Sequence, residues 1–176
     1  LSQEGSPVTR EQAEQWTYQP GLPDGAPIPR STNLDSAAAM AIAWAGDEVE
    51  LAENPVGDWS PQATIHFINS LPAELSNEKL GELDAGWGLS KTSNAEIGRT
   101  WFIQVATRRY TDAYTELEAH LNRFGRGRLI APVYSALASN GEDRELALEM
   151  FERARGAYHP ITTGWIEAGF KRAAAD

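Results

Sequence analysis

The chain has 176 residues, enough for one domain with a sizeable hydrophobic core. Its formal net charge of -10 argues against general nucleic-acid binding, and no apolar run is long enough for a membrane span. The absence of cysteine excludes disulfides, thiolate metal sites and cysteine nucleophiles.

The start of the chain is polar and carries no signal-peptide pattern. Because it begins at Leu1 rather than at methionine, we expect a fragment or a processed product. The compartment stays open: the lack of cysteine slightly favours the cytoplasm, and the periplasm is the alternative.

Residues 1–30 are predicted to form a short helix and a proline-rich connector that follows an upstream domain. Thr9 is the expected N-cap, with Gln12 at the capping-box position. The prolines that follow fix φ and donate no backbone hydrogen bond, so they favour an extended segment. This segment is either a flexible linker or, because of Trp16 and Tyr18, a segment held against an apolar surface.

The rest of the chain, residues 31–176, shows helical periodicity, with no strand-like alternation over a useful length. A helix is expected to begin at Asn33 or Asp35 and to end near Gly46. Ser60 and Ser76 are the expected N-caps of the next two helices.

The later helices are predicted from regular apolar spacing, in the segments 93–110, 111–125, 142–158 and 159–175. Gly125 is expected to be a left-handed C-cap. The helix between these segments either begins near Arg126 with a kink at Pro132, or begins only at Pro132. Short loops predict stacked antiparallel helix pairs, as in a short helical-repeat solenoid.

No catalytic or metal-binding motif is found in the sequence. His66, His120 and His159 lie at no metal-ligand spacing, and H-E-x-x-H, nucleophile-elbow and phosphate-loop motifs are absent. We interpret His66 as a core residue and His159 as a structural residue near a helix start. The carboxylates of residues 141–152 are interpreted as a solvated helix face.

A cluster of arginines is the most unusual local feature of this acidic chain. Arg123, like Arg108 and Arg109, is explained as a cation at a helix C-terminus. Arg126 and Arg128 lie at or before the start of the next helix, where free N–H groups and an arginine fork suit a carboxylate. The alternative is a solvated arginine turn.

Several segments of the sequence resemble the C-terminal domain of the leukotriene A4 hydrolase and aminopeptidase B-like zinc peptidases. In chain order they are "WTYQPGLP" (16–23), "NAEIGRTWFIQVATRRYTDA" (94–113), "GRGRLIAPVY" (125–134) and "AYHPITTGWIEAGF" (157–170). Residues 49–88 match poorly.

The resemblance implies an all-α domain of armadillo- or HEAT-like stacked helix pairs in a right-handed superhelix. It also implies a catalytic domain in the same polypeptide that holds zinc, with no cofactor and no catalytic residue in this chain. By position, Arg126 corresponds to the family's arginine that recognises the free carboxylate of a peptide or fatty-acid substrate. Arg128 stands where the family has a lysine.

The first functional hypothesis is therefore the C-terminal domain of a zinc aminopeptidase, catalytically silent alone. Its expected partners are the catalytic domain and the peptide substrate, with no nucleic acid and no membrane. The second hypothesis is a stand-alone helical-repeat interaction module. Epoxide hydrolase activity is a third, and it requires residues outside this chain.

Overall fold

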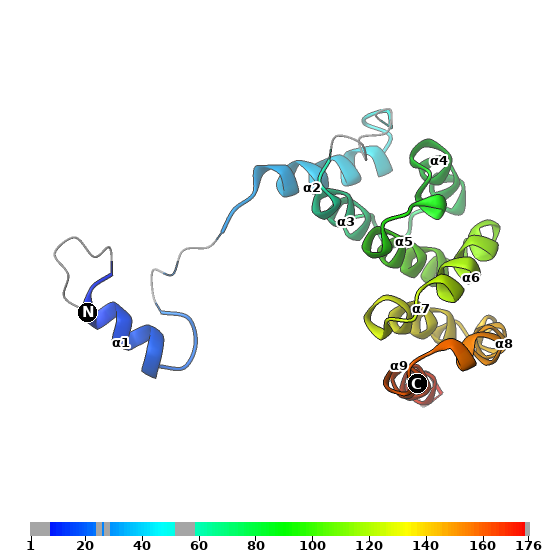
Figure 1. Cartoon of the computed structure of the whole chain (residues 1–176). Helices are drawn as coiled ribbons and strands as arrows, with labels where there is room; N and C mark the ends of the chain where they lie inside the picture. Colours follow the sequence, from blue (N-terminus) through cyan, green and yellow to red (C-terminus); the bar gives the residue numbers. More distant parts are fainter. Residues whose placement is uncertain (1–7, 24–25, 27–28, 52–58, 175–176) are drawn as a thin grey trace. The chain divides into compact units, whose positions relative to one another are not determined.

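The computed structural model describes residues 8–23, 26, 29–51 and 59–174, and in these residues all regular secondary structure is helical. The chain divides into two compact units, residues 1–31 and 32–176. Figure 1 shows the course of the chain through both units.

The first unit contains one helix, α1 (Arg10–Tyr18). The predicted capping box is confirmed: the Gln12 N–H donates to Thr9 Oγ1 at 3.2 Å, and the Thr9 N–H donates to Gln12 Oε1 at 2.8 Å. No residue of α1 is buried, and both Trp16 and Tyr18 are exposed. The described residues of this unit therefore do not form the apolar contact that the two aromatic side chains suggested.

The second unit is built from helices packed in two rows (Figure 1). In one row α3 packs against α5, α5 against α7 and α7 against α9, while α4, α6 and α8 lie on the other side. This arrangement confirms the predicted all-α fold of stacked helix pairs. The helices are α2 (Thr32–Ala45), α3 (Pro61–Asn69), α4 (Asn77–Trp87), α5 (Ala95–Arg108), α6 (Tyr114–Arg123), α7 (Gly127–Ser139), α8 (Arg144–Ala154) and α9 (Pro160–Arg172).

Short 3₁₀ turns connect several of these helices: η2 (Leu89–Lys91), η3 (Thr111–Ala113) and η4 (Arg155–Ala157). The predicted N-caps are confirmed, because Ser60 Oγ accepts from the Ala63 N–H at 3.2 Å and Ser76 Oγ from the Lys79 N–H at 3.3 Å. Helix α2 begins at Thr32, just before the expected start.

The start of α7 at Gly127 agrees with the first of the two sequence alternatives, and Pro132 lies inside the helix. The expected left-handed C-cap at Gly125 is wrong. Helix α6 is instead closed by Phe124 in an extended conformation, and its N–H donates to the His120 carbonyl at 3.2 Å. The Phe124 ring packs against the His120 ring, with centroids 4.8 Å apart, so side-chain packing rather than a left-handed residue holds this turn.

The core runs between the two rows and contains an aromatic cluster toward each end. The cluster near α9 joins the rings of Tyr134, Phe151, Tyr158 and Phe170, and the Tyr158 hydroxyl donates to the Leu121 carbonyl at 2.9 Å. Burying each large apolar side chain stabilises the fold by roughly 1.5–3 kcal/mol. This core fixes the spacing of α5, α7 and α9, on which the candidate site is built.

Candidate functional site

Arg126 is the N-cap residue of α7, and its side chain is exposed. Its carbonyl accepts the first bond of the helix, from the Leu129 N–H at 2.8 Å. Its guanidinium caps nothing and has no hydrogen bond or ion pair with any residue that the structure describes. A cation therefore stands beside the free N–H groups of a helix start with no anion of its own.

Arg128 lies one residue into the same helix and differs from Arg126 in its pairing. Its guanidinium forms an ion pair with Glu96, in the first turn of α5, although 58% of the Arg128 side chain remains exposed. The two arginines predicted from the sequence are thus adjacent in the fold but not equivalent. Within the described part of the chain, Arg126 has no carboxylate partner, whereas Arg128 is paired with Glu96.

The remaining arginines of the sequence analysis fall into two groups. Arg123 is exposed at the end of α6, with its guanidinium 5.2 Å from the Phe124 ring centroid, in keeping with a helix-end cation. Arg108 and Arg109 do more than complement a helix dipole. Arg108 donates to the Pro72 carbonyl at 2.7 Å, and Arg109 adopts a left-handed φ of 55° and reaches to the start of α8.

Asp143 is the group that Arg109 reaches, and it is only 4% exposed. Arg109 Nε donates to Asp143 Oδ2 at 2.9 Å and Arg109 Nη2 to Asp143 Oδ1 at 3.2 Å, while the Tyr114 hydroxyl donates to the same carboxylate at 2.7 Å. The interpretation of the carboxylates of 141–152 as a solvated face is therefore wrong for Asp143. A carboxylate that receives three hydrogen bonds at a junction between helix pairs is buried because it is paired.

His120, rather than His66, is the histidine buried in the core. His66 is half-buried rather than a core residue. His120 is 6% exposed between the rings of Phe102 and Phe124, and its Nε2 is buried without a hydrogen-bond partner in the described structure. Its burial, with a smaller contribution from the Arg123 charge, lowers the pKa of His120 to about 4. Its spacing from Leu117 and Leu121 on one helix face was the signal of its burial.

His159 has the structural role expected of it. Its Nδ1 accepts from the Ile161 N–H at 3.2 Å and so caps the start of α9.

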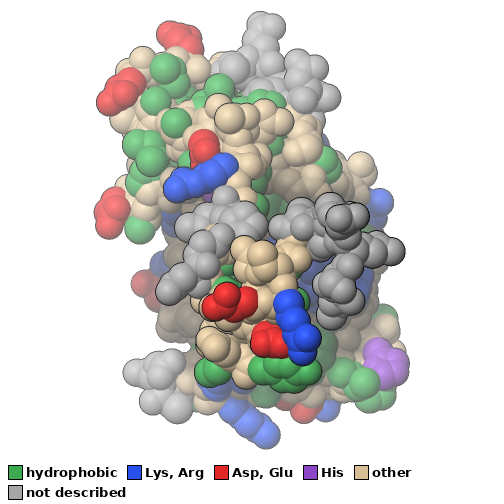
Figure 2. Space-filling model, turned by 90° about the vertical axis from the view of Figure 1, so that its left-hand side faces the viewer, with side chains coloured by type: hydrophobic (Ala, Val, Ile, Leu, Met, Phe, Trp, Pro, Cys, Tyr) green, Lys and Arg blue, Asp and Glu red, His purple; other side chains and the backbone are tan. Residues whose placement is uncertain are grey.

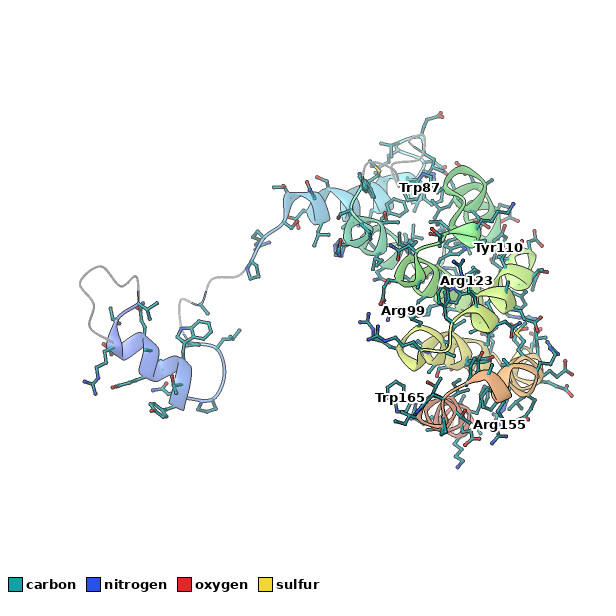
Figure 3. The ribbon with its side chains drawn as sticks, viewed as in Figure 1. Trp87, Arg99, Tyr110, Arg123, Arg155 and Trp165 are labelled. Atoms are coloured by element: carbon teal, nitrogen blue, oxygen red, sulfur yellow. The ribbon has the colours of Figure 1, made fainter. Side chains whose placement is uncertain are left out.

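A cavity of about 250 Å³ lies between α5, α7 and α9, beside Arg128. We name it the arginine cavity; it is lined by Arg99, Gly127, Arg128, Ala131, Pro132, Ser135, Trp165 and Arg172. Figure 3 shows that Arg99 and Trp165 project on the same side of the row formed by α5, α7 and α9. The sequence analysis missed Arg99, Trp165 and Arg172, because each is a single residue on a different helix and only the packing of the row unites them.

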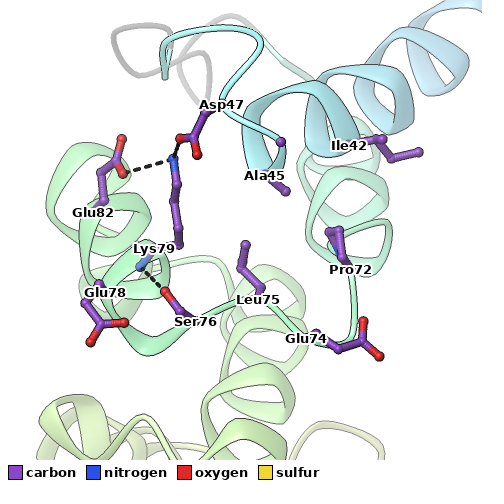
Figure 4. Close-up of a pocket in the computed structure, with 11 residues that line it drawn as sticks. Ile42, Ala45, Asp47, Pro72, Glu74, Leu75, Ser76, Glu78, Lys79 and Glu82 are labelled. Carbon is purple, nitrogen blue, oxygen red and sulfur yellow. Dashed lines mark hydrogen bonds and ion pairs between the residues drawn. The ribbon is translucent and has the colours of Figure 1, made fainter.

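A larger cavity, of about 700 Å³, lies near the C-terminal end of α2 (Figure 4). Ile42, Pro72 and Leu75 give it apolar walls, and four of the other eight lining residues are acidic. Its cation, Lys79, is already paired with Asp47 at 2.5 Å and with Glu82 at 3.5 Å.

The described residues contain no group of histidine and carboxylate side chains that could hold a metal ion. Among them there is also no helix with the length and apolarity needed to cross a membrane. On the face drawn in Figure 2, side chains of both charges are interspersed with scattered hydrophobic ones.

Comparison with known proteins decides the family. Residues 59–170 match the family described as "Leukotriene A4 hydrolase, C-terminal". The chain belongs to this family. The match covers more than half of the sequence and includes three of the segments on which the resemblance was based. It also includes residues 59–88, most of the 49–88 stretch whose resemblance was poor.

The relatives of this C-terminal domain are considerably longer proteins. The chain is 28% identical to leucine aminopeptidase 2 of Pyricularia oryzae over 85% of its own length and 24% of that protein's. It is 30% identical to leucine aminopeptidase 2 of Ajellomyces capsulatus over 88% of its length and 25% of that protein's. The chain thus spans about a quarter of the relatives it matches.

A solved structure supports the fold of the domain. Native leukotriene A4 hydrolase from Saccharomyces cerevisiae matches 90% of this chain and 29% of its own, with a TM-score of 0.71 and 23% identity. At this identity the likeness establishes the stacked-helix fold alone.

Proposed function

We propose that this chain is the C-terminal helical domain of a zinc-dependent aminopeptidase and that it closes one end of the active-site cleft. Its family, and relatives named leucine aminopeptidases of which it spans about a quarter, support this function. The partner of the domain would be a catalytic domain in the same polypeptide. Zinc held there would supply the activated water for peptide hydrolysis.

The part of this domain would be to hold the free carboxylate of the peptide substrate, through Arg126. The observation that carries this proposal is an exposed guanidinium at a helix N-terminus that has no partner among the described residues, in a chain of net charge -10. A guanidinium binds a carboxylate through two parallel hydrogen bonds, and the helix dipole adds to the attraction. Fixing the carboxylate would place the first peptide bond of a short substrate at the catalytic centre.

Arg128 would have a secondary part in the same site. Its ion pair with Glu96 is largely solvent-exposed, and such pairs contribute roughly 0–1 kcal/mol. A substrate carboxylate on Arg126 would therefore compete with Glu96 for Arg128 at small cost.

The experiment compares tripeptides with a free C-terminus and with an amidated C-terminus in the full-length enzyme. Arg126→Ala should lower kcat/KM for the free acid by about 10- to 100-fold, the loss expected for a hydrogen bond to a charged group. The amidated peptide should be cleaved as in the wild type. Arg123→Ala is the matched control, because Arg123 is an exposed arginine of the preceding helix end. Equal losses on the free and the amidated peptide would refute the carboxylate role.

A further inference from the structure

The arginine cavity carries more positive charge than its surroundings neutralise. Arg99, Arg128 and Arg172 line it, and Glu96 is the carboxylate paired with this group, so among the described residues three cations face one anion. Arg99 Nε lies 3.7 Å from Glu96 Oε2, too far for a hydrogen bond, and this nitrogen is buried without a partner in the described structure. Arg172 has no ion pair with any described residue.

The rest of the cavity wall is closely packed on one side and suited to a short side chain. The Trp165 ring lies against the backbone of Gly127, where an added Cβ would stand 2.5 Å from Trp165 Cε3. The ring is nevertheless 54% exposed, so one face remains available. Ser135 places its hydroxyl near the backbone of Gly169, at the same end of the cavity as Arg172.

The size of the cavity limits what it can hold. A volume of about 250 Å³ is below the roughly 300–1,000 Å³ of pockets that enclose a whole small-molecule ligand. It is suited instead to one side chain of a larger ligand. Among the described residues, Arg99 has an N–H without an acceptor and Arg172 has an unpaired guanidinium, and both features favour a carboxylate.

We propose that the arginine cavity binds the side-chain carboxylate of a glutamate at the C-terminus of the peptide substrate. The proposal rests on the proposed function, because the α-carboxylate of the same residue would lie on Arg126. Arg128 joins the two positions, since it lines the cavity and is two residues from Arg126. The α-carboxylate would thus be recognised at the start of α7, and the side-chain carboxylate by Arg99 and Arg172 on the flanking helices. The substrate class would be short peptides that end in an acidic residue.

The test measures kcat/KM of the full-length enzyme for Ala-Ala-Glu, for Ala-Ala-Gln and for amidated Ala-Ala-Gln. The wild type should prefer Ala-Ala-Glu over Ala-Ala-Gln about tenfold, as expected for a charge-assisted hydrogen bond of about 1.4 kcal/mol. Arg172→Gln should abolish this preference, so that kcat/KM for Ala-Ala-Glu falls to about the value for Ala-Ala-Gln. Arg172 is exposed, so this variant should fold normally. Lys171→Gln removes a neighbouring exposed charge that does not line the cavity, and it should keep the preference.

Arg99 provides the second pair of variants. Arg99→Gln should also abolish the preference, and Arg99→Lys should restore only part of it, because lysine keeps the charge but loses the planar fork. Thermal unfolding of each variant identifies any that fail to fold, in which case the result with Arg172→Gln decides.

The outcomes separate this proposal from the one on which it rests. Equal rates with Ala-Ala-Glu and Ala-Ala-Gln in the wild type, or a preference that survives both Arg99→Gln and Arg172→Gln, would overturn the cavity proposal. Failure of the Arg126 proposal would appear differently, as equal rates with Ala-Ala-Gln and its amide.

Discussion

Two arginine-bearing turns between helices have opposite electrostatic environments. At the turn after α5, Arg109 is held by the buried Asp143 at 2.9 Å and by Glu142. At the turn after α6, Arg126 has no partner in the described structure. The difference lies in what the next helix pair supplies: the chain before α8 provides two neighbouring acids, and no acidic residue occurs between Ala119 and Gly141. An arginine that is paired with carboxylates of the chain links helices, whereas an arginine without such a partner is available to a ligand.

The largest effect is expected at the turn after α5, where Arg109 is paired with Asp143. Asp143→Ala would leave Arg109 and the Tyr114 hydroxyl without their shared buried acceptor, and leaving hydrogen-bond donors unpaired at such a site costs about 2 kcal/mol. Urea unfolding of the 176-residue chain measures this loss. Glu142→Ala is the matched control, since the Glu142 side chain is 77% exposed and its loss should change the free energy of unfolding by no more than about 0.5 kcal/mol. Similar losses from both variants would remove the distinction between a buried link and a surface pair.

The second prediction concerns the turn after α6 and the buried His120. Burial and the Arg123 charge lower the pKa of His120 to about 4, whereas in the unfolded chain it returns to about 6.5. As the pH falls from 6.5 to 4, the unfolded state binds a proton that the folded state does not. The free energy of unfolding should therefore decrease by up to about 1.4 kcal/mol per pH unit.

The measurement compares how the free energy of unfolding depends on pH in the wild type and in His120→Gln. The comparison is needed because carboxylates titrate in the same pH range. The extra decrease below pH 6.5 should be missing from the variant. Parallel curves for the two proteins would mean that His120 accepts a proton in the folded state and that this turn tolerates further positive charge.

The contrast between the turns also marks what the sequence could predict. Caps such as Thr9, Ser60 and Ser76 are local, since each side chain bonds a backbone N–H three residues away, and they were predicted correctly. The pairing of Asp143 with Arg109 spans 34 residues and depends on how two helix pairs stack. Spacing along one helix carries no information on such a partner.

The residues of the candidate site also fall into those that the sequence could indicate and those that it could not. Arg126 and Arg128 could be named because they stand together at a helix start in an acidic chain. The arginine cavity could not, because its cations come from α5, α7 and α9 and meet only after the row has packed. The Gly125 prediction failed for a related reason, since the ring contact between Phe124 and His120 overrides the local preference for a left-handed glycine cap.

A third prediction tests the packing around the turn after α6. Gly127→Ala would place a Cβ 2.5 Å from Trp165 Cε3 and 3.2 Å from Thr162 Oγ1, so the indole must move. Because Trp165 is half-exposed and has room to shift, the cost should be about 1 kcal/mol, at the low end for overpacking. Urea unfolding measures the cost, and the indole emission, with Trp165→Phe as the reference, reports the movement. Gly141→Ala is the control, since nothing lies within 4 Å of its added Cβ.

The smallest effect is expected from Glu96→Gln, which removes the one carboxylate paired with Arg128 among the described residues. An exposed ion pair contributes little, so the free energy of unfolding should change by less than about 1 kcal/mol.

The effect of Glu96→Gln on kcat/KM should be opposite in sign to that of Arg126→Ala. With Arg128 released, the turn after α6 gains a second unpaired guanidinium, and kcat/KM for free-acid tripeptides in the full-length enzyme should rise about threefold, while amidated peptides should not change. A fall in kcat/KM for free-acid peptides would mean that Glu96 positions Arg128 for the substrate rather than competing with it. In that case the contrast between the two turns would be one of degree, because each would use a carboxylate of the chain to fix an arginine in place.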